Sequence, residues 1–338
     1  MKLTMLFGAA ALTLAAIPNA QAADFYAGKT LTIIAATAPG GGYDTHARLV
    51  QRHLGKHIPG NPNVIVQNMP AGGGMAAANH MYAIARKDGT EIGLFNRNTL
   101  FSPMLGDDLA KFKSEEFQWI GTPASYSDNA YTFFIQSKLP YKTLEEARKA
   151  SPELAIGNIG SVPVRITKDA LGVNMRLIGG YTGAQLDIAF ERGEIDGAGS
   201  SYANLLMSHK DWIERPLLRF LVQYGSDKRL PALKDVPTAR EMAKNPEDLQ
   251  LIKFSELALT LGFPIAAPPG APADLVAILR KAFDDTMKDP EYLADSKKSQ
   301  MEYSPKNGAG LQADFVDMAK APDSVKQRYK KLVDEERR

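Results

Sequence analysis

The strongest chemical signal in the sequence is a glycine-rich loop between an apolar, β-branched run and a helix-like pattern. Residues 38–44 read APGGGYD. Glycine lets a ligand approach the backbone closely, and a helix that begins in such a loop offers unpaired N–H groups and about half a positive charge to an anion. The loop therefore predicts the capture of an anion, with Ala38, Gly41, Gly42 and Tyr43 as candidate contacts.

Asp44 begins the helix-like pattern, and Arg48 follows one helical turn later. In one interpretation the carboxylate lies favourably at the positive end of the helix dipole and pairs with Arg48. In the other, Asp44 shapes the glycine loop and orders water in a ligand cleft. The sequence leaves both interpretations open, and Asp44 belongs to the candidate site in either one.

Asn96 is the last residue of a predicted strand at residues 93–96, and Arg97 follows it, so we expect both side chains at the mouth of a cleft. A guanidinium group can hold a carboxylate with two parallel hydrogen bonds. Arg97 would then anchor a second anionic group, which favours a dicarboxylate ligand. A surface salt bridge is the commoner role of such an arginine.

The sequence contains no G-x-x-x-x-G-K-[ST] loop, no H-E-x-x-H and no G-x-S-x-G. It also contains no cysteine, which excludes thiol catalysis and cysteine-bound metals. His53 and His57 have the spacing of a metal pair, but no carboxylate accompanies them, so we predict that they and His46 are solvated. We expect no catalytic residues, no cofactor and no metal.

These residues must be positioned by an alternation of strand-like and helix-like segments. The alternation predicts an α/β architecture with parallel strands, and 338 residues suggest about two domains. A helix at 144–150 would begin with a capping box formed by Thr143 and Glu146. Predicted strands cover residues 29–37, 64–68, 93–96, 119–120, 130–136, 154–158, 175–179, 195–199 and 217–224. Other predicted helices cover 43–56, 74–86, 164–171, 184–192, 272–288 and 313–336.

Four predicted strands run into a glycine-bearing loop that leads into a helix, at residues 38–42, 69–74, 158–161 and 181–183. In open α/β sheets, ligands bind beyond the carboxyl ends of the strands. Two loops come early and two late, which predicts two half-sites facing each other across a cleft, although a single such loop can be a simple tight turn. The second early loop adds the candidate contact Gly72, and the two late loops add Asn158, Gly160, Ser161, Tyr181 and Thr182.

The composition is that of an ordinary soluble protein, with 44% hydrophobic and 23% charged residues and a net charge of +2. No strong field therefore favours nucleic acid. Residues 1–22 have a positive start, an apolar core and an A-x-A end, which predicts a signal peptide cleaved after Ala22 and export to a bacterial periplasm. We expect a free, soluble monomer, because no cysteine is available for a lipid anchor.

Several stretches, in the right order, resemble the substrate-binding receptors of tripartite tricarboxylate transporters, the Bug family. They cover nearly the whole chain after the signal. They are PGGGYDTHARL at 39–49, VIVQNMPAGG at 64–73, KDGT at 87–90, LRFL at 218–221, DVPT at 235–238 and APPGAP at 267–272.

The resemblance implies a two-domain periplasmic-binding-protein fold, type II-like, with mixed sheets and a ligand cleft between hinged domains. Domain I would comprise residues 23–121 and 225–338, and domain II residues 122–224. Family ligands are mostly small carboxylates held by backbone N–H groups, hydroxyls and waters. The resemblance also implies membrane permease subunits as partners.

Two departures from the family pattern concern the ligand. Tyr43 stands where a small serine or threonine is common, and residues 179–183 read GGYTG where the family usually has P-Y-K-G, so a lysine is missing. The leading hypothesis is capture of a di- or tricarboxylate or an aromatic acid for a permease. A periplasmic sensor and an enzyme acting on an anionic substrate are the alternatives.

Overall fold

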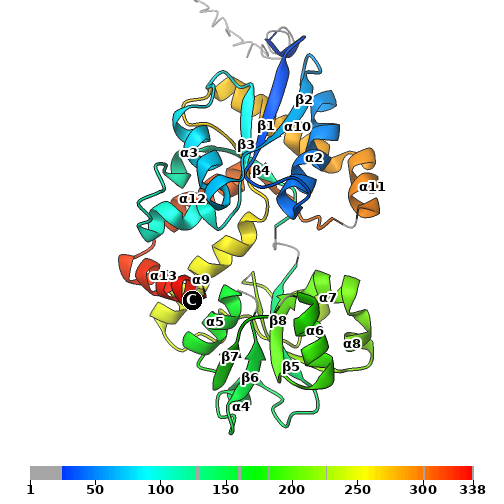
Figure 1. Ribbon diagram of the computed structural model, residues 1–338, viewed down its shortest axis with the longest axis vertical. Helices are drawn as coiled ribbons and strands as arrows, with labels where there is room; N and C mark the ends of the chain where they lie inside the picture. Colours follow the sequence, from blue (N-terminus) through cyan, green and yellow to red (C-terminus); the bar gives the residue numbers. More distant parts are fainter. Residues whose placement is uncertain are drawn as a thin grey trace, which may run out of the picture.

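The computed structural model describes residues 25–125, 129–158, 161–181, 183–225, 227–299 and 301–336. The predicted signal peptide lies outside these residues. The chain forms two α/β lobes, one beyond the other along the long axis of the molecule (Figure 1). We call the lobe with the six-stranded sheet lobe I and the lobe with the five-stranded sheet lobe II.

The sheet of lobe I has the order β11-β4-β10-β3-β1-β2. Strands β1, β2 and β3 are parallel, as the sequence predicts, whereas β10 is antiparallel to β3 and β4, and β11 is antiparallel to β4. The late strands β10 and β11 join the sheet from the other end of the chain, so the sheet is mixed. The strands are β1 (Thr30–Ala35), β2 (Asn63–Asn68), β3 (Glu91–Leu94), β4 (Gln118–Thr122), β10 (Ile265–Ala267) and β11 (Lys306–Asn307).

Helices cover both faces of this sheet. Alternate residues of β1 point to opposite faces: Ile33 packs in the core under α2 and α10, and Ile34 in the core under α3 and α12. On the second face, Trp119 stacks on Phe315 with ring centroids 4.0 Å apart. The helices are α2 (Gly42–Leu54), α3 (Met75–Ala83), α10 (Ala273–Lys288), α11 (Pro290–Lys298) and α12 (Gly308–Ala319). Short 3₁₀ segments are η1 (Gly55–His57), η2 (Ala71–Gly74), η3 (Thr99–Leu105) and η4 (Ser114–Glu116).

The sheet of lobe II has the order β7-β6-β8-β5-β9, with β5 antiparallel to both of its neighbours. The predicted cap of α4 is confirmed, because the Thr143 side chain accepts a hydrogen bond from the Glu146 amide. The strands are β5 (Tyr131–Gln136), β6 (Leu154–Gly157), β7 (Met175–Ile178), β8 (Gly197–Ser201) and β9 (Leu218–Tyr224). The helices are α4 (Leu144–Ala147), α5 (Val162–Asp169), α6 (Gly183–Arg192), α7 (Tyr202–Ser208) and α8 (Lys210–Glu214).

After β9 the chain stays close to lobe II before it returns. The Gln223 amide bonds to the Pro237 carbonyl, and Arg148 bonds to the Met242 carbonyl. Helix α9 (Pro246–Leu261) then crosses between the lobes (Figure 1). The predicted domain boundary at residue 225 stays a prediction. These contacts indicate that the chain returns from lobe II to lobe I along α9.

The helical end of the chain differs from the sequence prediction. A single helix over residues 313–336 is wrong: α12 ends at Ala319, and α13 (Asp323–Glu336) begins after Pro322. Proline cannot continue a helix because it lacks an N–H group and its ring clashes with the preceding turn. Helix α13 packs on α9, on α5 of lobe II and on η3 of lobe I, so it contacts both lobes.

Candidate functional site

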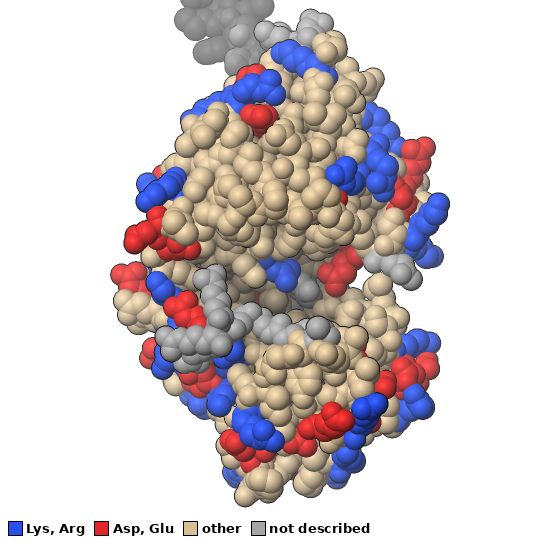
Figure 2. Space-filling view, viewed as in Figure 1, with Lys and Arg blue, Asp and Glu red and all other residues tan. Residues whose placement is uncertain are grey.

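A hollow lies between the two lobes, and acidic and basic side chains face into it (Figure 2). Two cavities lie along this hollow. The α13 cavity, of about 320 Å³, is lined by residues of η3, α5, α9 and α13 and by Tyr131. The Glu302 cavity, of about 480 Å³, is lined by Ser125, Asn129, Glu302 and residues of α7. Both cavities take walls from both lobes.

Asp44 is buried beneath the first glycine loop and holds its shape. One carboxylate oxygen accepts hydrogen bonds from the Gly40 amide (2.8 Å) and from Arg48 Nε (2.9 Å), and the other accepts from Asn68 Nδ2 (2.8 Å). Burial by itself would raise the pKa of Asp44, but bonds from Arg48, Gly40 and Asn68 lower it to about 2. The geometry therefore supports the ion pair of the first interpretation and the loop shaping of the second. The ordering of water by Asp44 stays a prediction.

Tyr43 joins the first loop to the loop after β3. Its hydroxyl accepts from the Arg97 amide (3.3 Å) and donates to Asn96 Oδ1 (3.5 Å). Its ring meets Phe263 edge-on, with centroids 4.9 Å apart. The tyrosine that stands in place of a small residue thus takes on a bracing role between two loops.

The second glycine loop is tied to the same group. Gly72, Gly73 and Gly74 have φ values of 63°, 65° and 97°, a left-handed conformation that favours glycine. The Gly73 carbonyl accepts from Thr99 Oγ1 (2.9 Å) and Asn96 Nδ2 (3.5 Å). Three loops of lobe I therefore form one bonded cluster, and Ala38, Gly41, Gly42 and Gly72 are exposed on it.

Lobe II contributes the loop before α5. The side chain of the buried Asn158 accepts a hydrogen bond from the Ser161 amide at 2.8 Å. Ser161 precedes the helix and lines the α13 cavity together with Arg97 of lobe I. Its Oγ is buried and, among the described residues, has no hydrogen-bond partner. A buried hydroxyl without a partner is costly and points to water or a ligand.

Three predicted contacts in lobe II are not tested as ligand contacts. Gly160 and Thr182 lie outside the described residues. Tyr181 is half-buried against the core under α6 and lines a shallow depression there with Gly180 and Gln185. The side chain of Tyr181 is thus placed beside α6, and its role as a ligand contact stays a prediction.

Sequence reasoning missed the residues that form most of the walls. They come from segments far apart in the chain, and no spacing connects them. Phe101, Leu105, Tyr131, Leu259, Tyr329 and Val333 line the α13 cavity.

Glu302 is a further residue that the sequence did not indicate. It lies before β11, and Ser201 Oγ, at the end of β8, donates to its carboxylate at 3.4 Å, which joins the two lobes. Burial raises the pKa of Glu302, while the charge of Arg97 and the bond from Ser201 lower it. The mouth of the cleft therefore carries an acidic side chain, Glu302, as well as a basic one, Arg97.

The prediction of solvated histidines is wrong. His46 is 2% exposed and stacks on Phe263 with centroids 3.7 Å apart, and burial lowers the pKa of His46 to about 3. His53 Nε2 lies 3.1 Å from an Asp295 oxygen, and His57 Nε2 lies 2.8 Å from an Asp289 oxygen. The carboxylates missing from the local sequence are supplied by the loop between α10 and α11 and by α11 itself.

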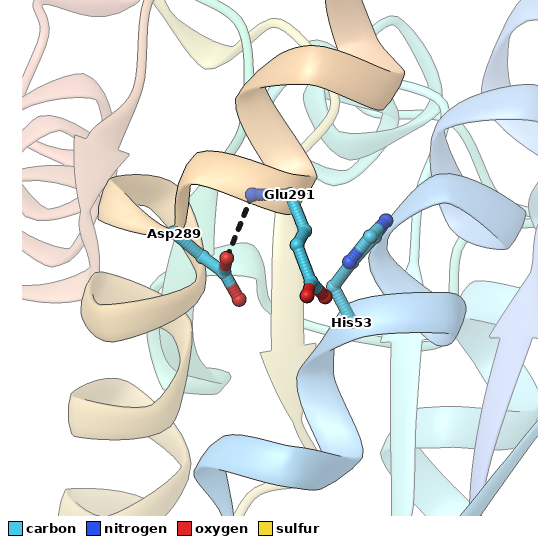
Figure 3. Close-up of side chains that lie close together, drawn as sticks. All are labelled: His53, Asp289 and Glu291. Atoms are coloured by element: carbon cyan, nitrogen blue, oxygen red, sulfur yellow. Dashed lines mark hydrogen bonds between the residues drawn. The ribbon is translucent and has the colours of Figure 1, made fainter.

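His53, Asp289 and Glu291 lie close enough together to be considered as a metal site (Figure 3). However, Lys56 Nζ lies 2.5 Å from Asp289 and 2.6 Å from Glu291, so an ammonium group already bridges the two carboxylates. Asp289 also accepts from the Glu291 amide at the start of α11. This arrangement is an ion-pair network that fastens α2 and η1 to α11, and the expectation of no metal stays a prediction.

Solved structures share this architecture. The chain is 20% identical to a TctC solute binding protein from Polaromonas, with a TM-score of 0.69 over 91% of this chain and 98% of that one. It is 19% identical to MatC from Rhodopseudomonas palustris with bound malate, with a TM-score of 0.53 over 90% and 99%. The fold, two α/β lobes with mixed sheets and a cleft between them, is that of the periplasmic binding proteins.

The family model described as the tripartite tricarboxylate transporter family receptor matches residues 46–327. A curated relative from Agrobacterium vitis, the UPF0065 protein in the TAR-I ttuE-ttuC' intergenic region, is 28% identical over 297 residues, which cover 84% of this chain and 79% of the relative. The chain belongs to the tripartite tricarboxylate transporter receptor family. Among the described residues, no helix is long and apolar enough to cross a membrane.

Proposed function

We propose that this protein is a periplasmic receptor that captures a small organic carboxylate between its lobes and delivers it to the membrane permease of a tripartite tricarboxylate transporter. One observation carries the proposal: Arg97 of lobe I and Ser161 of lobe II line the same cavity. A carboxylate held by both would bridge the lobes and favour a closed arrangement, as ligands do in hinged binding proteins.

The loop cluster of lobe I suits an anion. The exposed Gly41 and Gly42 open α2, where unpaired N–H groups and the helix dipole attract negative charge. Asp44 is buried with three donors of its own, so its charge is compensated within the loop. Malate bound to a protein of the same fold supports a carboxylate ligand.

A thermal-shift screen of mono-, di- and tricarboxylates, amino acids and aromatic acids tests capture. A ligand at 100 times its Kd adds about 2.7 kcal/mol, which corresponds to a rise in Tm of roughly 5 °C or more. Arg97→Ala should weaken the same acid about 10- to 100-fold. Arg176→Ala is the matched control, because Arg176 is exposed on β7 and lines neither cavity. A screen without any shift would refute capture.

Delivery and export need their own measurements. Uptake of the labelled acid into vesicles that carry the permease subunits should depend on added receptor. The mature protein from the periplasm should begin at Ala23, as cleavage after Ala22 requires. Uptake that is independent of the receptor would leave a sensory role as the better account.

A further inference from the structure

We propose that the α13 cavity receives the apolar body of the ligand, so that the captured acid is a monocarboxylate with an aromatic or extended aliphatic body. This inference rests on the proposed function and narrows its ligand class. It competes with the prediction that Arg97 binds the second carboxylate of a dicarboxylate.

One side of the cavity is formed by aromatic and aliphatic side chains. Phe101 of η3 and Tyr329 of α13 stack at 5.7 Å with their planes 25° apart, and Phe254 of α9 packs against both rings. Apolar side chains extend this side of the lining: Leu105, Val162, Pro163, Ala258, Leu259 and Val333. Uncharged polar side chains complete the lining: Asn98, Ser102, Tyr131 and Ser255. Such walls favour an apolar ligand surface that leaves water.

The size of the cavity fits one small molecule. Its volume of about 320 Å³ lies at the lower end of the range for ligand pockets, roughly 300–1,000 Å³. A cavity of about 150 Å³ holds benzene. The α13 cavity therefore has room for an aromatic ring, or for a short aliphatic chain, with its carboxylate at the mouth.

The charge of the lining limits the ligand to one anionic group at this end. Arg97 is the one charged residue among the described residues that line the cavity. The buried Ser161 Oγ adds a donor from the other lobe, just before α5. A second carboxylate placed against the Phe101–Tyr329 pair would lose its hydration without gaining a cation, which is costly.

The wall made by α13 does not depend on a ligand. Arg328 of α13 bonds to Asp169 at the end of α5 and to Asp248 of α9. These ion pairs hold the helix across the side of the cleft. The subsite is thus preformed, which lowers the cost of ordering it around a ligand.

Titration calorimetry with two matched series tests the inference. The first series is acetate, butyrate, hexanoate, benzoate and phenylacetate, and the second is malonate, succinate and citrate. Because each buried methylene is worth about fourfold in affinity, we expect affinity to rise along the aliphatic series and to be high for the aromatic acids. The second series should bind at least tenfold more weakly than the best apolar acid.

A variant that fills the cavity sharpens the test. Val333→Trp should weaken the apolar acids at least tenfold, and its half-buried position allows a larger side chain. Ile84→Trp is the matched control, because Ile84 is exposed at the end of α3 and lines neither cavity. Its affinities should equal those of the unchanged protein.

The outcomes separate the two proposals. If the polycarboxylates bind tightly and the apolar acids do not, or if Val333→Trp leaves apolar acids unaffected, the inference is overturned and carboxylate capture stands. If no acid in either series binds, capture fails as well. The ligand series in the unchanged protein decides the matter even if a variant does not fold.

Discussion

The two halves of the cleft are built differently. In lobe I, side chains tie three loops to one another: Asp44 binds Gly40 and Asn68, and Tyr43 reaches the loop after β3. In lobe II, among the described residues, the loop before α5 is held by one side-chain bond, from the Ser161 amide to Asn158. We infer that lobe I offers a preformed half-site and that the ligand completes the half-site of lobe II.

The comparison predicts unequal costs when each loop loses its central side chain. Asp44→Ala removes the acceptor of three donors and should lower the free energy of unfolding by about 3 kcal/mol. Asn158→Ala removes one bond and should cost about 1 kcal/mol. Urea unfolding measures both. Equal costs would contradict the asymmetry between the lobes.

The buried His46 predicts that lobe I is sensitive to acid. Because the pKa of His46 is lowered to about 3 in the folded state, the unfolded state binds the proton first. The stabilisation is therefore complete above pH 6.5 and is lost as the pH falls towards 3, at about 1.4 kcal/mol per unit.

The test compares unfolding at pH 7.5 and pH 5.0. The unchanged protein should lose about 2 kcal/mol more than His46→Phe over this interval. Acidic groups contribute equally to both proteins, so the difference isolates His46. A parallel loss in the two proteins would show that burial does not lower the pKa of His46.

Neighbouring glycines of the second loop provide a finer contrast. At Gly74 a Cβ atom would lie 2.8 Å from the Ala36 carbonyl, whereas at Gly73 no atom lies within 4 Å of it. Both residues have positive φ. Gly74→Ala should cost about 2 kcal/mol and Gly73→Ala about 1 kcal/mol, measured by thermal unfolding. A larger cost for Gly73→Ala than for Gly74→Ala would contradict the close approach of the Ala36 carbonyl to Gly74.

Two tyrosines give the smallest expected effect. Tyr43→Phe removes the hydroxyl that braces the Asn96–Arg97 turn and should cost about 1 kcal/mol. Tyr181 lies beside α6 in lobe II, and its hydroxyl makes no hydrogen bond to the other described residues. Tyr181→Phe should therefore change stability by less than about 0.5 kcal/mol. If the two variants have the same denaturant midpoint, the Tyr43 hydroxyl does not brace the Asn96–Arg97 turn.

Local patterns predicted the parts of the site that short stretches of chain build. Residues 30–54 form a strand–loop–helix unit, and both the Asp44–Arg48 pair and the Thr143 cap follow from neighbours in sequence. The histidines show the limit of this reasoning. The carboxylates that pair with His53 and His57 come from Asp295 and Asp289, more than 230 residues away.

By itself, the sequence determined the α/β class, the glycine loops and their order, because strand periodicity, glycine and helix starts act within a few residues. The tertiary structure alone decided which loops face each other and what lies between them. Phe101, Ser161, Leu259 and Tyr329 meet around one cavity although they belong to four separate elements. Packing of apolar surfaces is non-directional and acts between segments at any distance along the chain, so their meeting depends on how the two lobes and α13 come together.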